Sequence, residues 1–349
     1  MELWGDNYPE REILRRIGRW EQICGIKRYQ IREGKGEGLE IAQFYTTGGL
    51  ELEVILSRGM DIGRAVYKGI PLCWISSSGY VHPSYYIPGG FGWLRSFGGG
   101  LLTTCGLYHA GPPAREEIEE IGLHGRVSHI PAERICLVQE WRDSALYLEA
   151  RGEIRETRIF GENLLLKRKI WMRGDDKRVF IEDVVKNEGF QPTPHMILYH
   201  INIGFPLISK YSYLEGEIEE VIPRDREAEE GKEEYHRFSE PIPSFKEKCY
   251  FLKVKEKGKG KARVSIINPR LGIKVYVEYS KSTLPYFVEW KMMGEGDYVV
   301  GLEPANTLIL PREELKKKGL LPHLSPQEEV VYHLEIGIED MGRKDEPEN

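Results

Sequence analysis

The sequence predicts an all-β protein, a large antiparallel β-sandwich with few short helices. Apolar and polar residues alternate over short segments, glycine- and proline-rich turns separate these segments, and little of the chain shows helical periodicity. Many short strands joined by such turns are typical of a sandwich, because each sheet must bury one face against another.

The strand signal is strongest in a set of short segments. They cover residues 50–56, 145–150, 164–172, 178–186, 262–267, 273–279 and 328–338. Two turns rich in Gly, Pro, Asn or Asp, at 173–177 and 268–272, each separate two of these segments. Turn residues of this kind between two strands predict two β-hairpins.

Helical signal is confined to two places. Residues 7–18 are expected to form one helix, and Pro311 is expected to begin a second, short one, because proline fits a first helical turn. The charged run 224–232 and the Lys/Gly-rich segment 253–261, interpreted as a hairpin tip, are expected to face solvent. The tail 342–349 is expected to fray.

The composition is that of an ordinary globular protein, since 40% of the 349 residues are hydrophobic and 30% are charged. A net charge of −6 indicates no basic face, so no nucleic-acid partner is expected. No apolar run is long enough to cross a membrane, and the N-terminus lacks the basic and apolar segments of a signal peptide. These features predict a cytoplasmic protein without a membrane partner.

The chain is expected to form one domain over residues 1–349, because no repeat or linker divides it. Its core is expected at about 36–340, with residues 1–35 as an N-terminal extension that packs on it. The five cysteines are scattered without the spacing of a zinc site or of a disulfide framework. We therefore expect no metal and interpret the thiols as buried and free.

The first candidate site residue is His124, in Gly122-Leu123-His124-Gly125-Arg126. Neighbouring glycines let a ligand approach closely, because they carry no side chain. A loop histidine with glycines that serve a turn explains the same pattern, and for a short motif taken alone this is the more common outcome.

The second candidate is His200, which lies in an apolar segment together with Asn202. In a strand, alternation places both on one face and Tyr199, Ile201 and Ile203 on the other, toward the core. Two polar groups on such a strand need hydrogen-bond partners or a ligand. A buried histidine bonded to backbone accounts for the pattern equally well.

The third candidate is Glu303, near the end of the apolar segment 298–305. Strand alternation places Gly301 and Glu303 on one face, where the glycine leaves room for a ligand. Burial disfavours the charged form of a carboxyl group and raises its pKa, which suits a general base near neutral pH. A strand-end glutamate in a salt bridge is the more common alternative.

Taken in order, Leu123-His124-Gly125, the segment from His200 to Pro206 and Leu302-Glu303-Pro304 resemble motifs of the aldose 1-epimerase family. The resemblance extends over about residues 39–338 and implies that superfamily's fold, the galactose mutarotase-like supersandwich. Within the superfamily the chain is most similar to an uncharacterised branch, a domain of unknown function. The segments that carry this second likeness are 57–63, 93–100, 104–107, 122–126 and Trp290-Lys291.

The resemblance implies chemistry at an anomeric carbon. Glu303 would act as base and His200 as acid in opening the sugar ring, with His124 as a second donor, and no cofactor or metal would be required. Tryptophan can stack on a sugar ring, and cations can donate to hydroxyl or carboxylate groups. The residues expected to bind substrate are Arg58, Asp61, Arg95, Arg126, Asn202, Trp290 and Lys291, with Trp93 as another stacking platform.

The implied partner is a small-molecule sugar or sugar acid, and the sequence indicates no oligomeric state. One alternative is another sugar or sugar-acid isomerase or epimerase on the same site, with an arginine on a substrate carboxylate. In a metal-dependent version the ligands would be His109, His124, His200 and Glu303. The other alternative is a carbohydrate-binding protein that retains the cleft without turnover.

Overall fold

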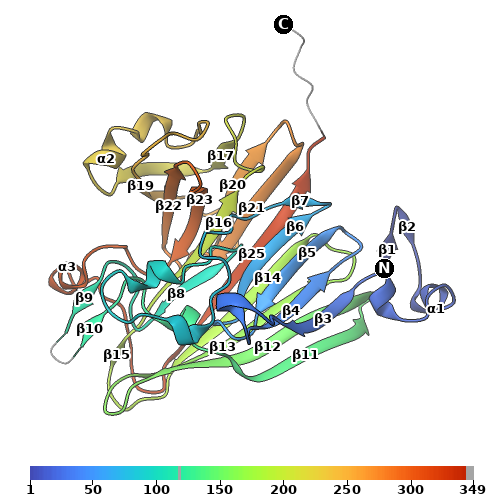
Figure 1. Cartoon of the computed structure of the whole chain (residues 1–349), viewed down its shortest axis with the longest axis horizontal. Helices are drawn as coiled ribbons and strands as arrows, with labels where there is room; N and C mark the ends of the chain where they lie inside the picture. Colours follow the sequence, from blue (N-terminus) through green and yellow to red (C-terminus); the bar gives the residue numbers. More distant parts are fainter. Residues whose placement is uncertain (117–118, 343–349) are drawn as a thin grey trace, which may run out of the picture.

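The computed structural model describes residues 1–116 and 119–342 and consists mainly of antiparallel β-strands (Figure 1). Within these residues the α-helices are α1 (Glu10–Leu14), α2 (Arg226–Glu229) and α3 (Arg312–Lys317). The prediction of an all-β sandwich with few short helices is confirmed. Except for Gly342, the tail expected to fray lies outside the described residues.

One layer of the sandwich is an eight-stranded antiparallel sheet. Its strands, in spatial order, are β11 (Glu133–Arg142), β12 (Ala145–Thr157), β13 (Asn163–Arg173), β14 (Arg178–Asn187), β25 (Glu329–Asp340), β21 (Ile273–Ser280), β20 (Lys261–Asn268) and β17 (Tyr213–Gly216). Burial alternates along β13 and β14, because one face of the sheet packs on the core and the other meets solvent. The turns at 173–177 and 268–272 join β13 to β14 and β20 to β21, so both predicted hairpins form.

The second layer combines two smaller sheets (Figure 1). The six-stranded sheet has the order β18 (Ile218–Pro223), β19 (Lys248–Val254), β22 (Tyr286–Met293), β23 (Tyr298–Ala305), β16 (Met196–Gly204) and β8 (Thr103–Leu107). The five-stranded sheet has the order β3 (Gly25–Gln30), β4 (Glu40–Tyr45), β5 (Leu50–Ile55), β6 (Asp61–Tyr67) and β7 (Ile70–Pro71). Isolated β-bridges from Ile62 to Leu102 and from Cys73 to Ile203 link the two sheets.

A buried arginine ties the two layers together. Arg168 of β13 donates to both carboxylate oxygens of Asp183 in β14, at 2.9 and 2.6 Å, and to Asp61 of β6 at 3.1 Å. From the other layer, Tyr199 of β16 donates to the same Asp183. Around this cluster the interface is apolar and draws on all three large sheets. Charges removed from water this completely are tolerated only when each is paired.

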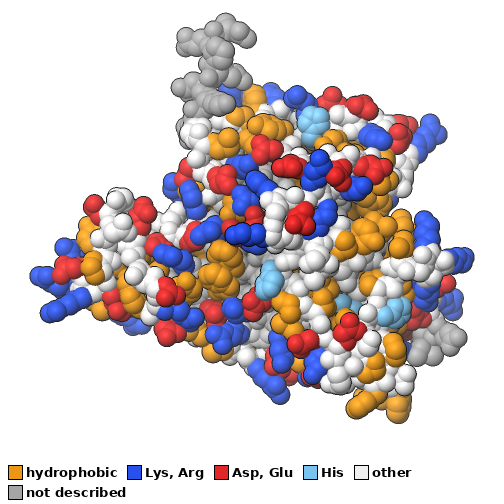
Figure 2. Space-filling model, turned by 180° about the vertical axis from the view of Figure 1, so that it is seen from behind, with side chains coloured by type: hydrophobic (Ala, Val, Ile, Leu, Met, Phe, Trp, Pro, Cys, Tyr) orange, Lys and Arg blue, Asp and Glu red, His pale blue; other side chains and the backbone are white. Residues whose placement is uncertain are grey.

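Shorter elements connect these sheets. They are β1 (Glu2–Leu3), β2 (Asp6–Asn7), β9 (Ala114–Arg115), β10 (Glu120–Ile121), β15 (Thr193–Pro194), β24 (His323–Leu324), and the 3₁₀-helices η1 (Trp20–Gln22), η2 (Gly34–Gly36), η3 (Pro83–Tyr85), η4 (Gly92–Arg95), η5 (Val127–His129) and η6 (Lys232–Glu234). On the face shown in Figure 2, positive and negative side chains are interspersed and do not separate into a patch of one sign.

The N-terminal helix is shorter than the predicted residues 7–18. Asn7 pairs with Glu2 between β2 and β1, and Pro9 is extended, so α1 begins only at Glu10 and ends at Leu14. Pairing to a neighbouring strand has overridden local helical preference. Farther along, Trp20 stacks on Trp141 of β11 with ring centroids 5.4 Å apart, which holds this region against the eight-stranded sheet.

Both charged segments face solvent over most of their length, as expected, and each differs from the expectation in one respect. In the run 224–232, Asp225 accepts a hydrogen bond from the amide of Ala228 and so caps α2, and the Ala228 side chain is buried. The segment 253–261 is not a hairpin tip, because it joins β19 of the six-stranded sheet to β20 of the eight-stranded sheet. At the other end of the chain, α3 begins directly after Pro311, as predicted.

Candidate active site

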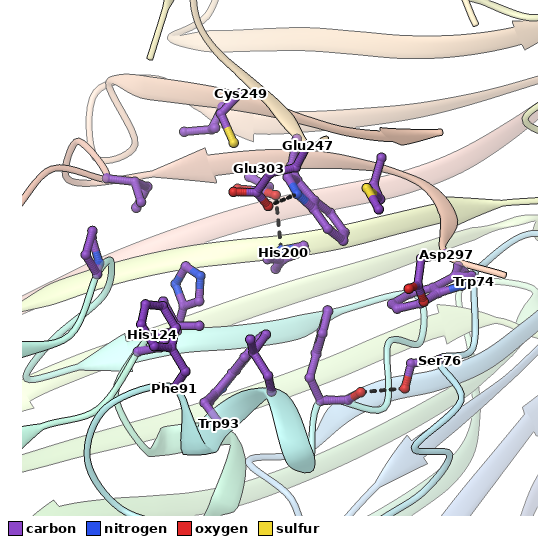
Figure 3. Close-up of a pocket in the computed structure, with 18 of the residues that line it drawn as sticks. Trp74, Ser76, Phe91, Trp93, His124, His200, Glu247, Cys249, Asp297 and Glu303 are labelled. Carbon is purple, nitrogen blue, oxygen red and sulfur yellow. Dashed lines mark hydrogen bonds and ion pairs between the residues drawn. The ribbon is translucent and has the colours of Figure 1, made fainter. Parts of the chain in front are cut away.

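His200 and Glu303 lie on adjacent antiparallel strands, β16 and β23. The register pairs Ile201 with Leu302 and Leu198 with Ala305, which makes His200 and Glu303 cross-strand neighbours. Nε2 of His200 lies 3.2 Å from Oε1 of Glu303 (Figure 3). Both side chains are almost fully buried, with 5% and 3% exposure.

The two strands turn these side chains away from the core between the layers. Tyr199 points the other way and donates to Asp183 of the eight-stranded sheet, so the adjacent His200 faces the outer side of the six-stranded sheet. There, loops cover a pocket of about 660 Å³ that both His200 and Glu303 line. Because one face packs on the core and the other on these loops, every residue of β16 and β23 is buried.

Gly301 is required by the close packing around Glu303. It pairs with Trp290 of β22, two residues before Glu303 on the same face of β23. A Cβ atom placed on Gly301 would lie 2.3 Å from Oε1 of Glu303 and 3.1 Å from Cβ of Trp290. The space that a side chain would fill at this position is therefore taken by the Glu303 carboxyl group itself.

His124 reaches the same pocket from a loop between β10 and η5 (Figure 3). Its backbone has φ +57°, and its ring lies 6.1 Å from the ring of His200, nearly perpendicular to it. Gly125 does not serve ligand access as the sequence suggested. A Cβ there would lie 2.2 Å from the carbonyl oxygen of His109 and 2.6 Å from that of Gly106, so the glycine lets the loop pack on backbone.

Burial controls the charge of all three groups. It raises the pKa of the Glu303 carboxyl well above its ordinary range, and nearby Glu247 raises it further. It lowers the pKa of His200 to about 4. It also lowers the pKa of His124 well below its ordinary value, with contributions from His200 and His109. Both imidazoles are therefore held neutral.

Each of the three side chains has a buried polar atom without a hydrogen-bond partner among the described residues. These atoms are Nδ1 of His124, Nδ1 of His200 and Oε1 of Glu303, whose 3.2 Å approach to Nε2 of His200 does not have hydrogen-bond geometry. An unpaired buried polar atom costs about 1–3 kcal/mol, so several of them around one pocket indicate a ligand or water that supplies the missing bonds. A polyhydroxyl molecule has the donors and acceptors for this.

Aromatic rings form the walls beside these polar groups. Phe97 and Trp290 pack against His200, each with ring centroids 5.2 Å from it. Trp93 stacks on Phe97 at 4.3 Å and also contacts the His124 ring at 5.0 Å. Trp93 is only 2% exposed, so it supports the two residues it touches more than it offers a face to a ligand.

Arg58 and Asp61, both expected to bind substrate, are placed away from this pocket. Arg58 is buried and bonds to the carbonyl of Val81 and to the ring of His129. Asp61 accepts bonds from Thr104 and Arg168 in the buried cluster between the layers. Their partners are structural, and we do not retain them in the proposed site.

Arg95, Arg126, Asn202 and Lys291 also fall outside the described lining of the pocket. The two arginines are exposed. Asn202 shares the face of His200, but its amide donates to the carbonyls of Gly100 and His200. Lys291 is turned to the opposite face from Trp290 and donates to three backbone carbonyls of the 234–237 segment. Of the residues expected to bind substrate, the pocket therefore includes Trp290.

Several lining residues were not found from the sequence. They are Trp74, Arg224, Glu247, Cys249 and Asp297. Arg224 lies at the start of the charged run 224–232, which the sequence indicated to be solvent-exposed surface. Glu247 comes near Trp290 because β19 pairs with β22, and Nε1 of Trp290 donates to the Glu247 carboxylate at 2.8 Å. No local pattern signals such contacts, because they depend on which strands become neighbours.

The proposed metal ligands are not gathered at one point. Nε2 of His109 donates to the carbonyl oxygen of Pro112, 2.8 Å away. Among the residues that the structure describes, no three His, Cys, Asp or Glu side chains are grouped so that they could hold a metal ion.

No helix in the described part of the chain is long and apolar enough to cross a membrane.

The sandwich of an eight-stranded sheet against two smaller sheets is a galactose mutarotase-like fold, as comparison with solved structures shows. A protein from Klebsiella pneumoniae with a provisional aldose 1-epimerase assignment matches with a TM-score of 0.85 and 21% identity, over 90% of this chain and 83% of that one. A galactose mutarotase-like protein from Clostridium acetobutylicum matches with a TM-score of 0.65 and 16% identity, over 92% and 100%. A galactose 1-epimerase from Lactobacillus acidophilus matches with a TM-score of 0.58 and 11% identity, over 91% and 100%. At these identities the likeness shows the fold.

The chain belongs to the family described as a domain of unknown function (DUF4432), whose model matches residues 36–338. The resemblance to aldose 1-epimerases found from the sequence is confirmed at the level of the fold, and the similarity to an uncharacterised family is confirmed by this match. No curated protein sequence matches this chain.

Proposed function

We propose that the chain is an aldose 1-epimerase-like enzyme that interconverts the anomers of a free sugar. The observation that carries the proposal is the convergence of Glu303, His200 and His124 on one pocket, each with an unpartnered buried polar atom among the described residues. Anomerisation needs a group that accepts the proton of the anomeric hydroxyl and a group that gives a proton to the ring oxygen. A carboxyl and an imidazole at hydrogen-bonding range of one substrate supply that combination.

In the proposed reaction the Glu303 carboxylate accepts the proton of the anomeric hydroxyl while the His200 imidazolium protonates the ring oxygen. The bond between the anomeric carbon and the ring oxygen breaks, which gives the open-chain aldehyde. Rotation about the C1–C2 bond exposes the other face of the aldehyde. As the ring closes, Glu303 gives its proton to the aldehyde oxygen, which becomes the new anomeric hydroxyl, and His200 takes back the proton of the hydroxyl that re-forms the ring oxygen. The enzyme therefore ends in its starting state with the opposite anomer formed.

The charge states follow from one shared proton. Burial favours the uncharged pair, in which the carboxyl keeps the proton and the imidazole is neutral. Transfer of this proton across the 3.2 Å between the two side chains gives the carboxylate and the imidazolium that the reaction uses. Neutral His124 is placed to donate to, or accept from, a further substrate oxygen.

A neutral sugar fits this pocket better than a sugar acid. Among the described lining residues, Arg224 is the cation, whereas Glu247, Asp297 and Glu303 are carboxyl groups. Arg224 is already paired, at 2.8 Å with Asp225 and at 2.9 Å with Glu247. A substrate carboxylate would therefore meet negative charge without a free cation, which disfavours its binding.

The test monitors anomer exchange by NMR and compares the exchange rates of anomerically pure neutral aldoses with those of uronic acids. We expect exchange of at least one neutral aldose well above the uncatalysed rate and weaker acceleration for the acids. Sugar binding by calorimetry without any exchange would instead identify a carbohydrate-binding protein. Exchange that appears only with an added divalent metal, and is lost on chelation, would favour the metal-dependent alternative.

A further inference from the structure

The pocket extends past the proposed catalytic groups. Its volume is about 660 Å³. A hexopyranose has about 12 heavy atoms, and at no more than the ~30 Å³ that one water occupies in the liquid it fills at most ~360 Å³. The pocket therefore has room for about one further sugar ring beyond the one at which the reaction takes place.

This additional room lies at an identifiable end. Figure 3 shows His124 and Phe91 at one end of the pocket, Trp74 and Asp297 at the other, and His200 with Glu303 between them. The rings of His200 and Trp290 are 5.2 Å apart, and those of Trp290 and Trp74 are 6.4 Å apart. Trp290 thus lies between His200 and Trp74 along the wall of the pocket, and all three line it.

The two ends differ in chemistry. Apart from His124, the end near Phe91 is lined by apolar side chains such as Leu123 and Ile309. The end near Trp74 carries the exposed carboxylate of Asp297 and the serines 76–78. A second sugar ring needs partners for its hydroxyl groups as well as an apolar surface for its C–H face. The end near Trp74 provides both.

We propose that the pocket binds the reducing unit of a disaccharide or short oligosaccharide at His200 and Glu303, and the next sugar unit against Trp74 and Asp297. This inference rests on the proposed function, because only a free anomeric hydroxyl can be exchanged. The reducing unit is joined to the next one through an oxygen other than its anomeric oxygen. The glycosidic bond stays intact, and the reaction is the same ring opening and closure described above.

The experiment compares kcat/KM for anomer exchange of maltose, cellobiose and lactose with that of glucose and galactose, in the wild type and in Trp74→Ala. We expect at least one disaccharide to be exchanged with a higher kcat/KM than its own reducing-end monosaccharide. Trp74→Ala should lower the disaccharide value about tenfold more than the monosaccharide value, as the loss of one aromatic contact predicts. Asp297→Ala is a second test, which does not depend on the folding of Trp74→Ala because Asp297 is exposed. It should also lower kcat/KM more for disaccharides than for monosaccharides.

The matched control is Trp4→Ala, since Trp4 is 80% exposed and lies on the β1–β2 turn, outside the pocket. Trp4→Ala should change kcat/KM for neither the disaccharides nor the monosaccharides. Equal losses for disaccharides and monosaccharides in Trp74→Ala and Asp297→Ala, or exchange of monosaccharides alone, would overturn this inference and leave the proposed function standing. Absence of exchange with every sugar would contradict the proposed function itself.

Discussion

Oε1 of Glu303 lies 3.2 Å from Nε2 of His200, across two neighbouring strands of the six-stranded sheet. The pocket raises the pKa of the carboxyl and lowers that of the imidazole, both chiefly through burial. At intermediate pH the two side chains therefore hold one proton between them. In the proposed reaction, that single proton lets one member act as base while the other acts as acid.

The pH dependence of turnover should be bell-shaped. Below about pH 4, where His200 becomes protonated, a second proton enters the pair and no base remains. Above the raised pKa of Glu303 the shared proton is lost and no acid remains. Initial rates of anomer exchange across the pH range test this, after subtraction of the buffer-catalysed rate. A rate that rises steadily with pH, without an alkaline decline, would exclude His200 as the acid.

Replacing either member of the pair should abolish most of the catalysis. Glu303→Gln keeps the shape and removes the proton acceptor, and His200→Asn removes the acid, so each should lower kcat about 10²-fold or more while sugar still binds. The double variant should be little worse than either single one, because the two groups act in one step. NMR exchange rates and calorimetric binding measure both effects. Wild-type exchange in Glu303→Gln would refute the mechanism.

Gly301→Ala should damage the site without unfolding the protein. The added methyl would fall 2.3 Å from Oε1 of Glu303, so the carboxyl group must move away from its present position beside His200. We expect kcat to fall about 10- to 100-fold, as for small displacements of a catalytic group, with the thermal midpoint little changed. The matched control is Gly18→Ala, where a Cβ has no atom within 4 Å. Full activity in Gly301→Ala would show that the position of the carboxyl is not critical.

The buried arginine between the layers should be essential for stability. Arg168→Met leaves Asp183 and Asp61 without their cation, and breaking a buried pair in this way costs about 3–5 kcal/mol of the free energy of unfolding. Arg134→Met is the matched control, because Arg134 is 71% exposed where it pairs with Glu153. It should change stability by less than about 1 kcal/mol. Denaturant unfolding compares the two, and similar small losses in both would contradict a structural role for Arg168.

Glu289, on the inner face of β22, should make stability depend on pH. Both of its carboxylate oxygens are buried without a hydrogen-bond partner among the described residues, and burial raises its pKa to about 8. Between pH 4.5 and about pH 8 the folded state therefore holds a proton that the unfolded state has released, so this contribution to stability is lost as the pH rises. Glu289→Gln should reduce that loss. Unfolding curves for both proteins at pH 5 and pH 8 measure it, and parallel pH trends would count against the shifted pKa.

Local patterns in the sequence predicted the fold class and the two hairpins, and the resemblance to a known family singled out the three residues that converge on the pocket. Strand alternation predicted that the side chains of His200 and Tyr199 point to opposite faces of their strand, and that Gly301 and Glu303 share one face. The structure agrees with both predictions. These features depend on a residue's own strand and its immediate neighbours. A period of two along one strand is enough to predict them.

The tertiary structure decided the rest of the pocket. Trp290 lines it while the adjacent Lys291 faces the other way and binds backbone carbonyls, although both were assigned to substrate. Trp74 and Glu247 join it only because distant segments pack beside β22. Which strands become neighbours is set by burial of the whole core and not by local sequence. The sequence by itself therefore identified three polar side chains of the pocket, and only the packed structure decided which other residues form its walls and its charge.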